Sequence, residues 1–254
     1  MRVLFIGDIV GKPGRKVVSS KVPELREEYG IDLVIANGEN SAGGLGLTPD
    51  TAEEIFQAGV DIITSGNHIW KHKEIVPYMD SGPPVIRPLN YPEGVPGKGS
   101  IIWNKVLVVN LMGRVFMGDL DCPFRAIDRL LNTCNPTPKV ILVDFHAEAT
   151  SEKNALGIYL DGRVSAVVGT HTHVGTVDTK VMPKGTAFVT DLGMVGPKDS
   201  VIGNEPEGII DMFLTGMPHR FTVGKGTSVF NSVLIDIGDN GLAKDIKRID
   251  LEMG

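Results

Sequence analysis

Residues 2–8 read Arg-Val-Leu-Phe-Ile-Gly-Asp, and this apolar run followed by Gly-Asp decides the fold class. A run that is apolar on both faces is typical of a central strand covered on both sides. Residues 15–29 carry apolar side chains at helical spacing and end before Gly30, which predicts a helix. Residues 32–37 (Asp-Leu-Val-Ile-Ala-Asn) form a second apolar strand. The chain therefore begins with a predicted βαβ unit.

The same pattern follows once more along the chain. Thr48 and Pro49 predict the start of a helix, with Thr48 as the N-cap, that runs to about Ala58. Residues 60–64 form a third apolar strand, and Gly-Asn-His follows at 66–68. Because each βαβ unit needs about 30 residues or more, this spacing fits two successive units and predicts an α/β fold.

The remaining elements are predicted from the same apolar periodicities and turn signals. Residues 100–103 and 106–111 form a hairpin joined by Asn104-Lys105. Further strands are expected at 139–145, 164–168, 187–190 and 228–237, and helices at 123–131, 151–160 (with Ser151 as N-cap) and 207–214. The sequence contains no internal repeat, low-complexity stretch or linker, so we predict a single domain over residues 1–254.

Composition narrows the class of function. The 254 residues are 42% hydrophobic and 22% charged, which excludes a disordered chain. The net charge of -6 argues against a protein that grips long nucleic acid through phosphate contacts. A small anionic substrate remains compatible with this charge, because bound metal ions reverse the local field.

The cysteines and the N-terminal sequence predict a cytoplasmic protein. Cys122 and Cys134 lack a CxxC spacing and are too few for a disulfide framework, so we expect reduced thiols. Residues 1–16 have too short an apolar run for a secretory signal. The sequence has no run of about 18 apolar residues, so we predict no membrane-spanning segment.

Polar side chains follow five of the predicted strands, at the point where each strand ends. In an open α/β sheet, ligands bind outside the carboxyl ends of the strands. We therefore expect these side chains to converge at one edge. They are Asp8, Asn37, Glu39, Asn40, Asn67, His68, His146, His171 and His173.

Taken singly, each of these residues has an ordinary structural interpretation. Asp8 is compatible with a helix cap or a turn, and Glu39 with a solvent-exposed loop. The asparagines are compatible with turns, and His146 with a histidine that is hydrogen-bonded inside the core. Their conjunction favours a metal site, because four of the six histidines follow apolar strands. Carboxylate, amide and imidazole ligands without thiolate suit manganese, iron or zinc. About seven candidate ligands exceed the needs of one ion, so two ions about 3.5–4 Å apart are expected.

The order of these motifs resembles the calcineurin-like metallophosphoesterases. That resemblance implies a four-layer α/β/β/α sandwich of two mixed sheets flanked by helices. The usual D-x-H is here Asp8-Ile-Val10, and the usual GDxxD is here Gly38-Glu39-Asn40. With the opening GDIVGKPGR at 7–15, both departures resemble the small bacterial YmdB-type phosphodiesterases. This subfamily implies hydrolysis of cyclic nucleotides, 2′,3′-cyclic and also 3′,5′-cyclic.

The resemblance also implies a role for each site residue. Asp8, Glu39 and His173 would bind the first ion, with Asn40 in place of the missing histidine. Glu39 would bridge the ions, and Asn67, His146 and His171 would complete the second. His68 would donate the proton to the leaving group after attack by a hydroxide that the two ions activate. Iron is the expected metal, with manganese or zinc as alternatives.

Two other functions are also considered. The first is a nucleotide-binding regulator with little turnover, in which the loop at residues 7–11 cradles a phosphate near a helix N-terminus. The second is a phosphomonoesterase with the same two metal ions. The expected partner is a small phosphodiester, and a homo-oligomer is compatible with this expectation.

Overall fold

One β-sheet is built mainly from the two ends of the chain, and the computed structural model describes residues 1–253. Its strands are β1 (Arg2–Ile6), β2 (Asp8–Ile9), β3 (Leu33–Asn37), β4 (Ile62–Thr64), β11 (Met194–Pro197), β12 (Ser228–Ile237) and β13 (Ala243–Met253). Their order is β2-β11-β12-β1-β3-β4, with β13 also paired to β12. β1 is parallel to β3 and antiparallel to β12, so this sheet is mixed.

The second sheet comes from the middle of the chain. Its strands are β5 (Ser100–Trp103), β6 (Val106–Met112), β7 (Val140–His146), β8 (Ala166–Thr170), β9 (Lys180–Val181) and β10 (Ala187–Val189). They lie in the order β5-β6-β7-β8-β10-β9. The four inner strands are parallel, and the two edge strands β5 and β9 are antiparallel to their neighbours. This sheet is mixed as well.

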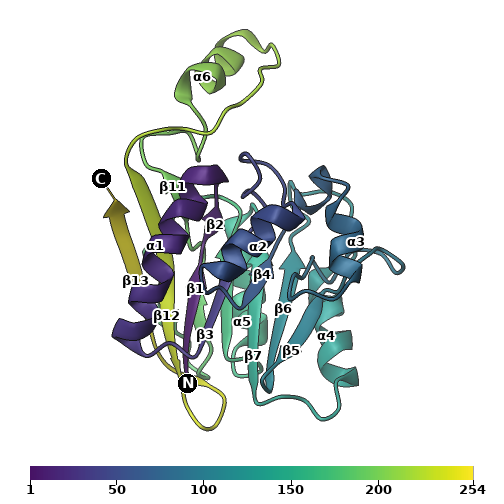
Figure 1. The fold of residues 1–254 in the computed structure, drawn as a ribbon. Helices are drawn as coiled ribbons and strands as arrows, with labels where there is room; N and C mark the ends of the chain where they lie inside the picture. The colour runs from purple at the N-terminus through teal and green to yellow at the C-terminus, as the bar shows by residue number, and fades with distance from the viewer. Residues whose placement is uncertain (254) are drawn as a thin grey trace.

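Helices cover the outer face of each sheet (Figure 1). α1 (Gly11–Tyr29), α2 (Pro49–Gln57) and α3 (Ile75–Asp80) lie on the first sheet, whereas α4 (Pro123–Thr133) and α5 (Thr150–Leu160) lie on the second. A short 3₁₀ helix, η1 (Ile69–Lys71), follows β4. The last helix, α6 (Pro206–Thr215), stands away from both sheets at the top of Figure 1.

Side-chain alternation along β1 shows how the layers are held together. Leu4 and Ile6 pack in the apolar cluster that includes α1 and α2. Val3 and Phe5 point the other way, into a second cluster that contains side chains of both sheets, such as Val108. A strand buried on both faces explains the continuous apolar run in the sequence. The expected four-layer α/β/β/α sandwich of two mixed sheets is confirmed.

Several local predictions are confirmed. Gly30 ends α1 in the left-handed conformation (φ 59°), where a residue without a Cβ is favoured. The Thr48 hydroxyl accepts a hydrogen bond from the Thr51 N–H at 3.2 Å, as expected of an N-cap. Asn104 and Lys105 join β5 to β6 with φ values of 46° and 69°, the left-handed pair of a tight hairpin.

Other predictions at this level are wrong. Helix α5 begins at Thr150 with Ala149 at its cap, so Ser151 lies inside the first turn and caps nothing. Helix α1 starts at Gly11 instead of residue 15. Strand β13 was not predicted, because its buried residues Ala243, Ile246 and Ile249 are three apart. Among residues 1–253, no helix combines the length and the apolarity needed to cross a bilayer.

Candidate metal centre

The predicted site residues gather at one edge of the sandwich, beyond the ends of β1, β3, β4, β7 and β8. A continuous series of contacts of at most 3.5 Å connects eight of them, although they come from five separate segments. Asp8, Glu39 and His146 are fully buried, and Asn40 is nearly so. The eight residues are Asp8, Glu39, Asn40, Asn67, His68, His146, His171 and His173.

One group of ligand atoms surrounds Nε2 of His146. Glu39 Oε1 lies 2.9 Å from this nitrogen, and Asn67 Oδ1 and His171 Nδ1 each lie 3.1 Å from it. One ring nitrogen carries at most one proton, so it cannot donate to three neighbours at once. Two ligand atoms that each lie about 2.1 Å from the same metal ion, at an angle of about 90° to one another, are about 3.0 Å apart. The distances from His146 Nε2 to its three neighbours match this separation. The group therefore fits a metal ion.

The Glu39 carboxylate gives an independent indication of a cation. Its Oε1 is buried and has no assigned hydrogen-bond partner among residues 1–253, although His146 Nε2 lies 2.9 Å from it. A buried charged oxygen without a partner is costly unless a positive group meets it. Ligand atoms of Glu39, His146 and His171 all lie within 4.8 Å of one another, which a single ion can span.

Gly66 allows the Gly-Asn-His turn to approach this group. A Cβ built on Gly66 would lie 2.1 Å from Cδ2 of the His146 ring. Any side chain at this position would therefore displace either the ring or the turn. The sequence needs glycine here so that Asn67 can reach His146.

A second group consists of Asp8, Asn40 and His173. Asp8 Oδ1 lies 3.6 Å from His173 Nε2, and the Asn40 amide nitrogen lies 3.1 Å from the same ring nitrogen. The backbone N–H of His171 donates to Asp8 Oδ2 at 3.1 Å. Because the His171 ring belongs to the first group, this bond places the two groups side by side.

Asn40 shows its nitrogen, not its oxygen, to the second group. Its Nδ2 faces Asp8 and His173, whereas its Oδ1 accepts a hydrogen bond from His68 Nδ1 at 2.7 Å. A metal ion would bind the amide oxygen, so the side-chain amide group of Asn40 would have to rotate by about 180° about its Cβ–Cγ bond. Val10 cannot contribute a ligand, because its aliphatic side chain has no donor atom; it is buried and packs close to Gly196 and Gly203. Ligation by Asn40 therefore stays a prediction.

The outward ring nitrogens of two histidines of the predicted site face oxygen atoms. His173 Nδ1 donates to the Ile202 carbonyl at 2.8 Å, whereas His171 Nε2 lies 3.2 Å from the Glu148 carboxylate without a hydrogen bond. The Ile202 carbonyl requires a proton on Nδ1 of His173, which leaves Nε2 of this ring with its lone pair facing Asp8 and Asn40. This is the arrangement found around metal-bound histidines, where the outer partner fixes the tautomer.

For His146 the outer partner is a threonine backed by a carboxylate. Thr170 donates its hydroxyl proton to Asp144 Oδ1 at 2.7 Å, so it accepts from His146 Nδ1 at 2.9 Å. Burial raises the pKa of Asp144 to about 6, although the hydroxyls of Thr64 and Thr170 act in the opposite direction. The polar chain His146-Thr170-Asp144 is fully buried.

Charge in the centre is concentrated on two carboxylates. Burial alone would raise the pKa of Asp8 and of Glu39, but the charges of His173 and His146 outweigh it and hold both below their ordinary values. Burial would lower the pKa of His146, yet the Glu39 and Asp8 charges raise it to about 9. In the absence of metal, His146 thus takes a proton in the place that a metal cation would fill.

Thr170→Val is expected to weaken metal binding without unfolding the protein. The variant removes the acceptor of His146 Nδ1–H, and loss of such an outer partner typically costs about 10–100-fold in metal affinity. Competition with a chromophoric chelator measures this change. Thr186→Val is the control, because that buried hydroxyl donates to the Val164 carbonyl at 2.7 Å instead of to a site residue. Equal affinities in the two variants would contradict the assignment.

His68 differs from the other three histidines of the site. Its backbone N–H donates to Glu39 Oε2 at 2.8 Å, and its Nδ1 donates to Asn40. Within residues 1–253 its Nε2 has no hydrogen-bond partner, and the ring lines a cavity. Burial lowers the pKa of this ring, although the Glu39 charge opposes the effect.

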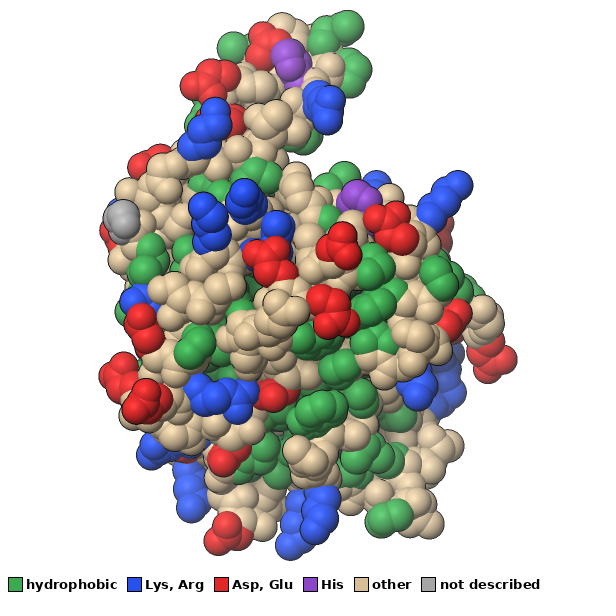
Figure 2. Space-filling view, viewed as in Figure 1, with side chains coloured by type: hydrophobic (Ala, Val, Ile, Leu, Met, Phe, Trp, Pro, Cys, Tyr) green, Lys and Arg blue, Asp and Glu red, His purple; other side chains and the backbone are tan. Residues whose placement is uncertain are grey.

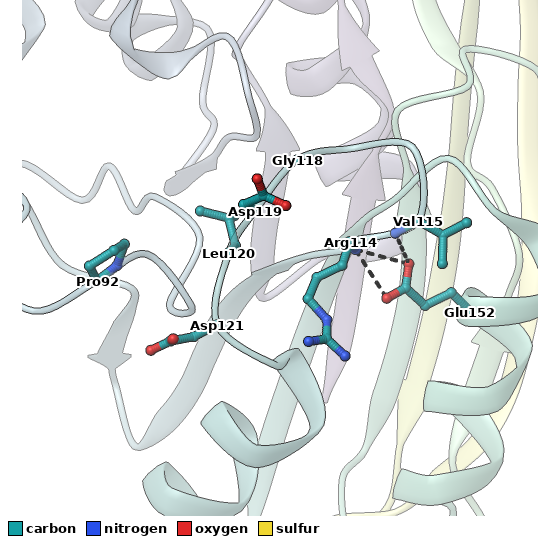
Figure 3. A pocket seen from close by; sticks show the side chains of 8 residues that line it. All are labelled: Pro92, Arg114, Val115, Gly118, Asp119, Leu120, Asp121 and Glu152. Atoms are coloured by element: carbon teal, nitrogen blue, oxygen red, sulfur yellow. Dashed lines mark hydrogen bonds between the residues drawn. The ribbon is translucent and has the colours of Figure 1, made fainter.

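A cavity of about 960 Å³ opens next to the two groups. Besides Asn40, His68, His171 and His173, its wall includes Gly44, Leu45, Lys71, His72, Glu148, Ile202, His219, Arg220 and Phe221. A different cavity of about 490 Å³, drawn in Figure 3, lies near the N-terminal end of α5. Asp119 and Asp121 line it, and Glu152 there accepts the backbone N–H groups of Arg114 and Val115. Its carboxylates make it unsuited to a phosphate ester.

Some residues that shape the centre were not predicted. Asp144 is an acid inside an apolar strand, which is a signal that the sequence does contain. Lys153 and Asp191 form a fully buried ion pair of 2.6 Å, and Asp191 also accepts the backbone N–H of Thr172 between the two histidines of the last motif. Nothing in the spacing of Lys153 and Asp191 indicates that they pair.

Comparisons with known proteins find similar sequences and structures over nearly the whole chain. A Bacillus subtilis (strain 168) protein named 2′,3′-cyclic-nucleotide 2′-phosphodiesterase is 50% identical over 243 residues, which cover 94% of this chain and 92% of that protein. The crystal structure of a hypothetical protein from Thermus thermophilus is 47% identical and superposes with a TM-score of 0.94, with 100% of both chains covered.

A solved structure described as a novel phosphatase, from Mycoplasma pneumoniae, is 34% identical with a TM-score of 0.94 and covers 100% of this chain and 94% of that one. The family model described as "YmdB-like protein" matches residues 4–249, which is nearly the whole chain. The family expected from the strand-end motifs is thus confirmed. The chain belongs to the YmdB-like family.

Proposed function

We propose that this protein is a metal-dependent phosphodiesterase that opens 2′,3′-cyclic nucleotides. The single observation that carries the proposal is the convergence of three histidines on buried carboxylates beside a cavity. The outer nitrogens of His146 and His173 are hydrogen-bonded to oxygen acceptors, and the inner nitrogens of His146, His171 and His173 face the group of Asp8 and Glu39. The expectation of a phosphoric diester hydrolase is supported by the relative from Bacillus subtilis, which carries that activity in its name.

The ligand set suits two ions. We infer that Asp8, Asn40 and His173 would hold the first, that Asn67, His146 and His171 would hold the second, and that Glu39 would contribute to both sites. Carboxylate, amide and imidazole ligands without thiolate suit iron, manganese or zinc, and iron is the metal we expect. Bound there, the ions would lower the pKa of a water nucleophile and offset the charge of the phosphoryl oxygens.

The chain's own residues contribute the other steps. His68 holds a ring nitrogen toward the cavity, where it can protonate the departing ribose oxygen. Lys71 and Arg220 give the cavity wall positive charge, which attracts an anionic ester to an otherwise acidic protein. A monoester has the same attraction to this centre, and the phosphatase among the solved relatives makes phosphomonoesterase activity the alternative.

Metal removal combined with a substrate panel tests the proposal. Chelator-treated protein should lose hydrolysis of adenosine 2′,3′-cyclic phosphate, and added iron or manganese should restore it. We expect the product to be adenosine 3′-phosphate, with slower release of inorganic phosphate from it. Faster release of phosphate from the monoester would favour the phosphomonoesterase, and tight binding without turnover would favour a regulator.

A further inference from the structure

The segment 205–222, called the arm below, carries α6 and stands out from the body. In Figure 2 it rises at the top of the molecule with a notch beneath it. Its root is a short ladder in which Asn204 pairs antiparallel with Val223 and Glu205 N–H donates to the Thr222 carbonyl at 2.8 Å. The root is therefore fixed, although the arm itself extends beyond the sheets.

The root is also packed against the loop that forms the opposite wall of the cavity. Gly44 has φ 91°, and a Cβ built there would lie 2.8 Å from Cγ2 of Val223. Only glycine allows this approach of the loop to the root. Leu45 and Ile202, which come directly after Gly44 and shortly before the root, both line the cavity and are 43% and 49% exposed.

Phe221 is an aromatic residue of the arm that lines the cavity. It directly precedes Thr222, whose carbonyl accepts the Glu205 N–H, so its backbone lies at the hydrogen-bonded end of the arm. It lines the cavity, yet 43% of its surface is exposed to solvent. An aromatic ring that lines a cavity and is only partly covered offers a face on which a flat ring can stack.

The cavity joins this aromatic face to the metal centre. The Ile202 carbonyl accepts the proton of His173 Nδ1, so the segment just before the arm's root contacts a predicted metal ligand. At one end lie the imidazoles of the predicted metal groups, where bound cations would attract the phosphate, and at the other lie Leu45, Ile202 and Phe221. A ligand with an anionic phosphate at one end and a flat base at the other matches this polarity.

From this geometry we infer that the arm supplies the base-binding end of the substrate site, with Phe221 stacking on the base of a nucleotide. The inference rests on the proposed phosphodiesterase function and adds a specificity-determining residue to it. Stacking depends on the π-face, which every base offers, so the site should accept purine and pyrimidine nucleotides alike. It should discriminate against cyclic esters that have no base.

The test compares two substrates that differ only in the base. They are adenosine 2′,3′-cyclic phosphate and the 2′,3′-cyclic phosphate of methyl ribofuranoside. Phe221→Ala should raise KM for the adenosine substrate by about 5- to 150-fold, the range for loss of one stacking contact, with kcat nearly unchanged. KM for the base-free substrate should stay the same. Phe221→Trp should restore the adenosine KM, because it replaces the π-surface.

Phe213→Ala is the matched control, because Phe213 lies on the same arm, is 78% exposed and is not part of the cavity wall. It should leave both KM values unchanged. An equal rise in KM for both substrates in Phe221→Ala would mean that the ring only shapes the arm, which overturns the inference. Turnover of both substrates by the unmodified protein with the same KM would also overturn it, while the proposed function would stand. Turnover of neither substrate by the metal-loaded protein would instead refute the proposed function.

Discussion

Glu39→Gln is expected to lose metal and phosphodiesterase activity together. The substitution keeps the shape of the side chain but removes the charge of a fully buried carboxylate whose Oε1 has no hydrogen-bond partner within residues 1–253. It also places an amide N–H group where Oε1 or Oε2 now lies. Metal ions supply several kcal/mol of transition-state stabilisation, so we expect activity to fall by at least about 10³-fold. Metal analysis of the purified variant and kcat/KM for adenosine 2′,3′-cyclic phosphate measure the two effects.

A control separates this effect from the loss of any carboxylate. Glu152→Gln makes the same chemical change at a residue that accepts backbone N–H groups of Arg114 and Val115 (Figure 3). That variant should keep its metal, because Glu152 contacts none of the site residues. Full metal occupancy in Glu39→Gln would contradict a role for Glu39 between the two ions, whatever the activity.

Continuous apolar runs made most of the strands predictable from the sequence. Strands such as β1 and β3 are buried on both faces, so their apolar runs are continuous and stand out in the sequence. Strand β13 is different, because Ile246 packs between the sheets while Ile249 packs on the helix side. Its buried residues therefore fall on opposite faces at a spacing of three. Neither of the two simple periodicities describes such a strand.

The site was predictable for a topological reason. Parallel strands of one sheet end at the same edge, so residues that follow β3 and β4 must meet there, as must those that follow β7 and β8. What surrounds them depends on packing between elements far apart in sequence. Lys153 lies on α5 and Asp191 follows β10, and their pairing appears only in the folded chain. The side-chain rotation of Asn40 is likewise set by its neighbours, not by its spacing.

His68→Ala is expected to keep its metal and to lose activity selectively. The inward nitrogens of the two ligand groups do not include His68, so the metal content should match that of the unmodified protein. General acid catalysis typically contributes about 10²–10⁴-fold, and we expect this loss on a cyclic nucleotide, whose ribose oxygen leaves as a poor alkoxide. Burial lowers the pKa of His68, but an anionic phosphate beside the ring favours its protonated form when substrate binds.

A nitrophenyl phosphodiester distinguishes an acid from a binding residue. Nitrophenolate leaves without a proton, so His68→Ala should lose far less activity on this ester than on adenosine 2′,3′-cyclic phosphate. His72→Ala is the control, because His72 lines the same cavity while its Nε2 donates to the Leu45 carbonyl at 3.0 Å. Equal losses on the two substrates would show that His68 binds the phosphate instead. The proton would then have to come from water or from another residue of the cavity wall.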